Sequence, residues 1–569
     1  MARMPTSTDR SATGSDVSPP RRRGGGFVSH AKLIGAITLL SRLLGLGREM
    51  VAAAFFGAGP IWSAFTVAFT IPNLFRKLFG EGALSAAFIP MYARMVGSGG
   101  RNEEQSAEDG EATPPEHALF AAASVNLLVY MLTAITLLGE LVLAGIWLFA
   151  DLGRPDYELA VVLTAIMLPY VVLICGAAFL GGILNVHERF AAPAAASVLL
   201  NLCLIAAIAA GAVIFDLDTD EGRAAATIWL GVAVVVSGVL QVLMLWPSLR
   251  RVGFRFRPGA SALTPATKRM LLVSLPVVLS AGVLQISVLL DRSIAFFLAE
   301  AEEGAASFWF LGWQVAYPMA EGAAARLAWA QYLYQFPLGV FAIALATAIF
   351  PKLSRDAAHH EGRNDDFRDG LRRGIEAALF IGLPASAGLV LVAEPAVRVM
   401  FERGRFTPDD TQWTALSTAI YSAAIWAFSL QQIINRAYYA LHDTVTPLVW
   451  AGINLALNLA IELPLIWTPL GEAGMAAGTL ASFSVQSIAM LWLLSRRLGG
   501  IGLRRSVAPI AKMVIATVLM TAACLLLRLI PGWPAGTGLR DSALQLGAVM
   551  VVGAATYFGI VRLLGVRMR

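Results

Sequence analysis

The segment Ser41-Arg42-Leu43-Leu44-Gly45-Leu46-Gly47-Arg48-Glu49 lies within an apolar run from about Leu33 to Phe56. The run is long enough to cross a bilayer, because a membrane helix needs about 20 mostly apolar residues. It places three ionisable side chains at membrane depth, where a charge costs roughly 2.5–3.5 kcal/mol and normally faces a protein interior or a watery cavity. The segment therefore predicts a membrane-spanning helix that borders the path of a substrate.

Composition extends this interpretation to the whole chain. Hydrophobic residues make up 57% of the 569 residues and charged residues only 14%, whereas soluble domains contain about 25% charged residues. Apolar runs of spanning length recur to the end of the chain, so we expect an all-α integral membrane protein with about fourteen transmembrane helices. The expected spans lie near residues 33–56, 61–92, 119–149, 159–184, 193–215, 225–246, 270–298, 327–350, 373–393, 412–440, 446–468, 473–494, 507–530 and 542–564.

Charges in the loops predict the orientation of the spans. Arginine and lysine cluster after the sixth, eighth and twelfth spans, and cytoplasmic loops of membrane proteins carry this excess. Both termini are therefore expected in the cytoplasm, with residues 1–29 as a disordered basic tail. Residues 299–326 are expected to form an external or interfacial insertion, because counting them as a span would invert every later basic loop. These arginines set topology, so nucleic-acid binding is not expected.

An internal repeat divides the chain. The segment Leu84–Arg94 is echoed by Leu345–Arg355, Arg48-Glu49 corresponds to Asp291-Arg292, and Asn201 corresponds to Asn454. The expected units are residues 30–250, with spans one to six, and residues 251–500, with spans seven to twelve. Residues 501–569 hold the last two spans. Parallel repeats of this kind are typical of alternating-access transporters, although a chance match of short apolar strings is the alternative.

Two segments of the first unit carry candidate ligands for an anion. Arg42 and Glu49 are seven residues apart and share a helix face, whereas Arg48 lies about 120° around the helix. The next span continues with the segment Ile71–Gly82, in which Asn73, Arg76 and Lys77 share a face and Pro72, Gly80 and Gly82 can break the helix. Arginine remains charged when buried and its planar fork suits phosphate or carboxylate. The alternative is a structural role, with Arg48–Glu49 and Arg76–Glu81 as buried pairs.

The second unit carries a different set of polar residues. Asp291 and Arg292 are the counterpart pair in the seventh span. Asn454 and Asn458 lie one turn apart in the eleventh span, and with Thr479 they offer oxygen atoms to a small cation. Such residues serve more often as interhelical hydrogen-bonding groups. Further ionisable residues in expected spans have no second supporting feature: Glu140, Glu376, Arg436 and Glu462.

Two further patterns bear on ATP hydrolysis and on metal binding. None of the lysines Lys32, Lys77, Lys268, Lys352 and Lys512 precedes Ser or Thr, which excludes a Walker A loop. The acidic segment Thr407-Pro408-Asp409-Asp410 is explained better by a helix N-cap than by a metal site.

Five motifs closely resemble those of the MurJ (MviN) family of lipid II flippases, and the resemblance covers nearly the whole chain after residue 30. They are Ser41–Glu49, Phe56-Gly-Ala-Gly59, Ala68–Gly82, Ala87-Phe-Ile-Pro90 and Gly404-Arg-Phe-Thr407. The resemblance implies a protein with two lobes around a central cationic cavity, which exports the undecaprenyl-pyrophosphate-linked peptidoglycan precursor across the bacterial inner membrane. It also implies a groove for the lipid tail at the last two spans.

The resemblance also assigns residues. Arg42, Arg48 and Arg76 fall on positions whose arginines the family uses, and Asn73 and Glu81 also match. Glu49 and Arg292 complete the expected set for the substrate. Some members bind sodium between spans seven, eleven and twelve, and a similar set here is Asp291, Asn454, Asn458 and Thr479. We expect a monomer that binds lipid II and membrane lipids and has no cofactor beyond a coupling sodium ion or proton.

This sequence departs from the family at three places. Ser63 replaces a frequent aspartate, Gln331-Tyr332 replaces an Asp-Arg pair, and the insertion at 299–326 is longer than usual. One expected cavity arginine is therefore missing, and Arg292 or Arg326 is expected to substitute. The alternatives are an exporter of another polyprenyl-linked saccharide, a drug exporter, a polyprenyl-phosphate transferase, or a degenerate scaffold.

Overall fold

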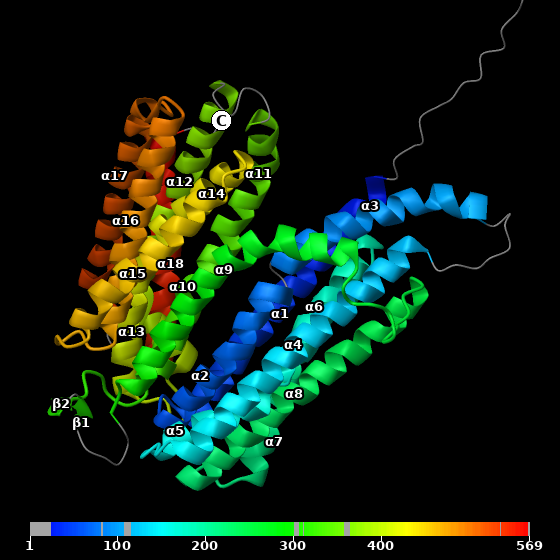
Figure 1. The fold of residues 1–569 in the computed structure, drawn as a ribbon. Helices are drawn as coiled ribbons and strands as arrows, with labels where there is room; N and C mark the ends of the chain where they lie inside the picture. Colours follow the sequence, from blue (N-terminus) through cyan, green and yellow to red (C-terminus); the bar gives the residue numbers. More distant parts are fainter. Residues whose placement is uncertain are drawn as a thin grey trace, which may run out of the picture.

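The computed structural model describes residues 24–80, 83–106, 115–300, 307–310, 312–357, 365–534 and 536–566. Two groups of helices meet near a β-hairpin and diverge toward the opposite end, where α3 and α11 lie (Figure 1). We call these ends the hairpin end and the α3 end. Residues 1–23 of the expected tail and the candidate residue Glu81 lie outside the described residues.

The first lobe comprises the helices up to residue 251. Helices dominate because backbone groups in hydrocarbon must form their hydrogen bonds within the segment. The elements are α1 (Gly24–Phe56), α2 (Pro60–Phe75), the π-helix η1 (Arg76–Gly80), α3 (Ala83–Ser106), α4 (Glu116–Phe149), α5 (Pro155–Met167), α6 (Tyr170–Val186), α7 (Ala191–Ile214) and α8 (Asp220–Arg251).

The second expected span is broken, as its Pro and Gly residues predict. Pro72 lacks an N–H group, and the Asn73 side-chain amide donates to the Phe69 carbonyl at 3.2 Å. The helix then changes to π geometry over Arg76–Gly80. Gly80 packs closely on α6, since a Cβ there would lie 2.9 Å from the Ala178 Cβ. A π segment inside a helix often marks a functional site.

The second lobe begins at α9, which contacts α2, α3 and α4 of the first lobe as well as α10 and α15. An antiparallel hairpin pairs Phe308 with Val315 within the expected insertion. The elements are α9 (Pro265–Phe297), β1 (Ser307–Phe310), β2 (Trp313–Ala316), α10 (Ala323–Pro337), the π-helix η2 (Leu338–Ala342), α11 (Ile343–Ala357), α12 (Asp365–Phe401), α13 (Pro408–Ala423), α14 (Ile425–Ala440), α15 (Val445–Leu465) and α16 (Ala473–Arg497).

The last helices pack on the second lobe. α17 (Val507–Leu526) and α18 (Leu539–Leu563) contact each other and α12. Short 3-10 turns, η4 (Leu503–Arg505) and η5 (Leu527–Leu529), flank α17. Large apolar side chains such as Val518 and Val551 remain exposed on these helices, as expected for surfaces that meet lipid.

Length and composition confirm an all-α membrane protein. In the described part of the chain nine helices qualify as membrane spans, or ten if α5 and α6, bent by 41°, form one span. The higher count of about fourteen remains a prediction. Each expected range nevertheless falls on a helix or on consecutive helical segments: residues 61–92, for example, cover α2, η1 and the start of α3.

Candidate transport site

The α1 segment forms a polar contact point inside the first lobe. Arg48 makes an ion pair with Glu49, and its guanidinium donates to the Asn201 Oδ1 of α7 at 3.3 Å. Asn201 in turn donates to the Ser41 carbonyl at 3.1 Å. The side chains of Arg48 and Glu49 are 15% and 14% exposed, so the pair is largely buried and still accessible.

The same segment touches the second lobe. The Trp329 indole of α10 donates to Glu49 Oε2 at 3.0 Å. Arg292 of α9 donates to the Thr70 hydroxyl of α2 at 2.6 Å and interacts electrostatically with Glu49. Glu49 therefore lies between a guanidinium of its own helix and a guanidinium of the other lobe.

Tyr332, which replaces the family arginine, lies where the arginines of the first lobe converge. A Cβ on Gly45 would be 2.7 Å from the Tyr332 hydroxyl, so α10 approaches α1 closely here. Arg42, Arg48 and Arg76 all interact electrostatically with this hydroxyl. The Arg42 guanidinium also lies against the backbone of η2 in the second lobe, at Gly339. The fold thus brings together three cations that the sequence places in separate segments.

Arg326 does not join these arginines, so the expectation that it substitutes for the missing one is wrong. It is 3% exposed and pairs bidentately with Glu472, with Nε–Oε1 and Nη2–Oε2 distances of 2.9 and 2.6 Å. Its Nη1 donates to Asp410 Oδ1 at 3.2 Å. No local sequence pattern reveals these ion pairs, because Asp410 and Glu472 lie far from Arg326 along the chain. Thr407 and Asp410 form a capping box, which confirms the expected N-cap.

A second polar cluster surrounds Asp291. The Asn458 amide donates to Asp291 Oδ1 at 3.3 Å and to Glu462 Oε2 at 2.8 Å. The Ser482 hydroxyl donates to Asn458 Oδ1 at 3.4 Å. The sequence alone offers no second feature in support of Glu462 and gives no sign of Ser482. The spacing of four residues between Asn458 and Glu462, which places both on one helix face, is the signal that links them.

Thr479 and Asn454, the other two residues expected to bind a cation here, are arranged differently from Asn458. The Thr479 hydroxyl donates to the Met475 carbonyl of its own helix at 3.2 Å. Asn454 is buried, and within the described residues its Nδ2 has no hydrogen-bond partner. Asn73 likewise uses its amide on the backbone of α2 rather than on an arginine.

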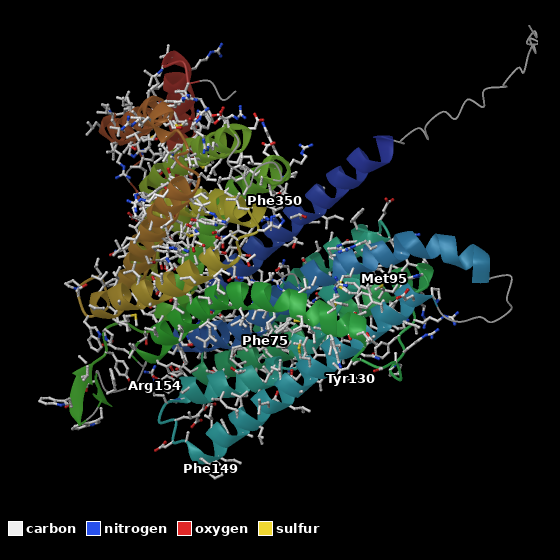
Figure 2. All side chains as sticks on the ribbon, turned by 45° about the horizontal axis from the view of Figure 1, so that its top comes forward. Phe75, Met95, Tyr130, Phe149, Arg154 and Phe350 are labelled. Carbon is white, nitrogen blue, oxygen red and sulfur yellow. The ribbon has the colours of Figure 1, made fainter. Side chains whose placement is uncertain are left out.

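Two of the family-like motifs meet at the hairpin end and join the lobes. The Arg405 N–H donates to the Ala54 carbonyl at 2.9 Å, and the Arg405 guanidinium pairs with Asp218 at 2.9 Å. Arg154, which Figure 2 labels at the same end, donates to the Ala299 carbonyl at 2.8 Å. Backbone approaches this close require glycine, and Gly57 and Gly404 both have positive φ.

Replacing Gly404 by Ala is expected to loosen this closure. Gly404 has φ +59°, and a Cβ there would overlap the Ala54 carbonyl of the other lobe. Left-handed strain of about 1–2 kcal/mol adds to that overlap. A cysteine introduced at Ala58, which is 7% exposed, should react about tenfold faster with a membrane-impermeant maleimide.

Gly253→Ala is the matched control for this experiment. Gly253 has φ +79°, and a Cβ there meets nothing within 4 Å. The control therefore carries the same backbone strain without a contact between the lobes. Equal acceleration in both variants, or none in Gly404→Ala, would contradict the role of Gly404 in closure.

Comparisons with known proteins identify the family. The sequence profile described as "Lipid II flippase MurJ" matches residues 52–538. The chain belongs to the MurJ family of lipid II flippases. The "Probable lipid II flippase MurJ" of Rhizobium meliloti is 32% identical over 538 residues, covering 93% of this chain and 92% of that protein. The "Lipid II flippase MurJ" of Burkholderia cenocepacia is 29% identical over 547 residues, covering 94% and 96% of the two chains.

Solved transporter structures share the fold. A structure titled "Lipid II flippase MurJ, inward closed conformation" has a TM-score of 0.68 at 20% identity, covering 93% of this chain and 97% of that chain. An inward-facing multidrug transporter of the MATE family has a TM-score of 0.63 at 16% identity, covering 83% of this chain and 98% of its own. The MurJ family assignment confirms the resemblance and the expectation of a transporter rather than an enzyme.

Proposed function

We propose that this chain is a lipid II flippase, which moves the undecaprenyl-pyrophosphate-linked disaccharide peptide from the inner to the outer leaflet of the bacterial inner membrane. The observation that carries the proposal is the family match over residues 52–538. The convergence of Arg42, Arg48 and Arg76 around Tyr332 supports it, since guanidinium groups bind phosphate oxygens with charge-assisted hydrogen bonds.

Arg292 takes the place of the missing family arginine in this proposal. Its guanidinium reaches from the second lobe to Thr70 of the first lobe, and its Nε has no hydrogen-bond partner among the described residues. A cation of the second lobe that meets Thr70 and Glu49 of the first lobe is well placed to bind the pyrophosphate from the side opposite Arg48.

Loop charges assign the hairpin end to the outside. Asp218 lies in the loop that reaches Arg405 at the hairpin end, whereas α8 and α16 end at the α3 end with Arg250, Arg251, Arg496 and Arg497. Basic loops face the cytoplasm. The lobes therefore meet on the outer side and diverge toward the cytoplasm, as Figure 1 shows for the two helix groups.

Export then proceeds by rocking of the lobes. Opening the hairpin end and joining the α3 end would transfer the head group, while the polyprenyl tail remains in lipid along α17 and α18. An inside-negative potential favours outward movement of an anion by about 2.3 kcal/mol per charge per 100 mV. The chain acts as a monomer, because each lobe supplies part of one site.

The cluster around Asp291 is the proposed coupling site. Among the described residues Arg292 is the cation that interacts with Asp291, and it also interacts with Glu49. The charged group that acts on Glu462 there is Asp291, another carboxylate. Two buried carboxylates with one cation favour uptake of a sodium ion or a proton. The donor set fits a hard cation only in part: carboxylate, amide and hydroxyl oxygens suit it, but the Asn458 amide now presents its nitrogen to both carboxylates. Sodium binding therefore requires the Asn458 amide to turn over, whereas protonation does not.

Replacing Asp291 by Asn is expected to remove the dependence of lipid II export on the coupling gradient. The substitution removes the charge and keeps the side-chain shape. In vesicles with an imposed sodium gradient, an imposed pH gradient or neither, the stimulated rate should fall at least about tenfold. Asp409→Asn, an exposed carboxylate of α13, is the control. Wild-type stimulation in Asp291→Asn would contradict the coupling site.

The proposed function is tested by complementation. The intact chain should support growth of a bacterium depleted of its own flippase and restore exposure of lipid II at the outer leaflet. Failure to do so with protein in the membrane would favour a scaffold. Export of another polyprenyl-linked saccharide but not lipid II would identify the nearest alternative, and Mg²⁺-dependent product formation by purified protein would identify a transferase.

A further inference from the structure

A polar face runs along α14 in the second lobe. Gln432, Asn435, Arg436 and Tyr439 follow the spacing i, i+3, i+4, i+7, which places them on one side of a helix. All four residues are partly exposed. The sequence alone singles out only Arg436 among them.

The buried side of α14 satisfies its polar groups inside the lobe. Gln431 accepts from the Ser487 hydroxyl at 3.2 Å, and the Tyr438 hydroxyl donates to the Met490 carbonyl at 3.2 Å. On the exposed face, Asn435 accepts one bond from Gln431 at 2.9 Å. Within the described residues, the Arg436 guanidinium makes no hydrogen bond or ion pair and stacks 5.2 Å above the centre of the Phe350 ring.

This exposed face does not meet lipid tails. None of the large apolar side chains of α14 (Ile425–Ala440) is exposed, whereas Val449 of α15, Ile488 of α16 and Val518 of α17 are. Polar side chains at membrane depth that are neither packed nor paired face a water-filled space. Figure 1 shows α11 and α14 on the side of the second lobe that faces α1, and Figure 2 shows Phe350 on the same side.

We propose that Arg436 forms a second anion site, which binds a carboxylate of the peptide part of lipid II while the first-lobe arginines hold the pyrophosphate. This inference rests on the proposed function. Arg436 lies one turn before α14 ends at Ala440, on the α3 end where the head group enters. Its planar guanidinium has five N–H donors, and stacking on Phe350 fixes their plane.

Neighbouring groups suit a peptide or sugar better than a pyrophosphate. Gln432 and Asn435 carry amides and Tyr439 a phenol, which donate and accept hydrogen bonds without adding charge. In the proposed function, the pyrophosphate is already bound by Arg42, Arg48 and Arg76 of the first lobe. Two anion sites on facing lobes would hold the two ends of an extended head group and select precursors that carry a peptide.

The test measures binding of three probes by the full chain in vesicles. The probes are lipid II, lipid II with its peptide carboxylates amidated, and undecaprenyl pyrophosphate without a head group. Arg436→Gln should weaken binding of lipid II about tenfold, since one charge-assisted contact is lost. It should leave the Kd of the other two probes unchanged, and Arg436→Lys should restore part of the affinity for lipid II.

Two comparisons make the result decisive. Arg496→Gln removes an arginine that stacks on Trp492 at the end of α16 and should change none of the three Kd values. If Arg436→Gln weakens all three probes equally, or none of them, the second anion site is wrong. If the wild-type chain binds none of the probes, the proposed function itself fails. An unchanged Tm of Arg436→Gln shows that the variant is folded.

Discussion

Replacing Arg48 by Ala is expected to lower lipid II exposure at the outer leaflet by at least about 100-fold while the protein still reaches the membrane. Arg48 is held in place by two side chains of the first lobe, Glu49 and Asn201. Its loss removes a cation from the pyrophosphate site and leaves the Glu49 carboxylate facing the anionic substrate. The measurement is labelling of exposed precursor in cells that depend on the variant.

Controls separate charge from packing in this experiment. Arg48→Lys keeps a cation but loses the planar fork, so it should retain part of the activity. Arg496→Ala removes an arginine outside the site and should leave export unchanged. Full export by Arg48→Ala, at wild-type protein levels, would remove Arg48 from the proposed transport site.

Replacing Arg326 by Met is expected to destabilise the fold by about 3–5 kcal/mol, because the Glu472 and Asp410 carboxylates then lose their buried partner. Arg326 and Glu472 are 3% and 2% exposed. The ion pair of Arg326 with Glu472 joins α10 to the turn before α16, and the ion pair of Arg326 with Asp410 joins α10 to α13. The measurement is the Tm of the purified protein, which should fall well below that of the wild type.

A double variant tests the cause of this loss. Arg326→Met combined with Glu472→Leu removes both main charges and should recover much of the Tm, because an apolar pair avoids an unpaired buried charge. Arg497→Gln breaks a more exposed pair with Asp443 and should cost less than about 1 kcal/mol. A Tm of Arg326→Met equal to the wild type would show that the buried triad does not stabilise the hairpin end.

The transport residues differ in how far the sequence predicts them. Arg42 and Arg48 stand out because charges within an apolar run are costly and therefore informative. The break at Arg76 follows from Pro72 and Gly80. Arg326 looks equally suitable as a cavity arginine, yet its partners Asp410 and Glu472 lie 84 and 146 residues away, and no local pattern reveals such pairing.

The sequence by itself determined the membrane class, the helical architecture, the family and the first-lobe arginines. These features depend on hydropathy and on costs that each segment carries alone. Only the tertiary structure decided that Arg326 is structural, that Glu462 joins Asp291, and that the polar face of α14 lies toward the first lobe. Each of these depends on which helices pack together, and the hydrogen bonds and ion pairs concerned join residues far apart in the chain.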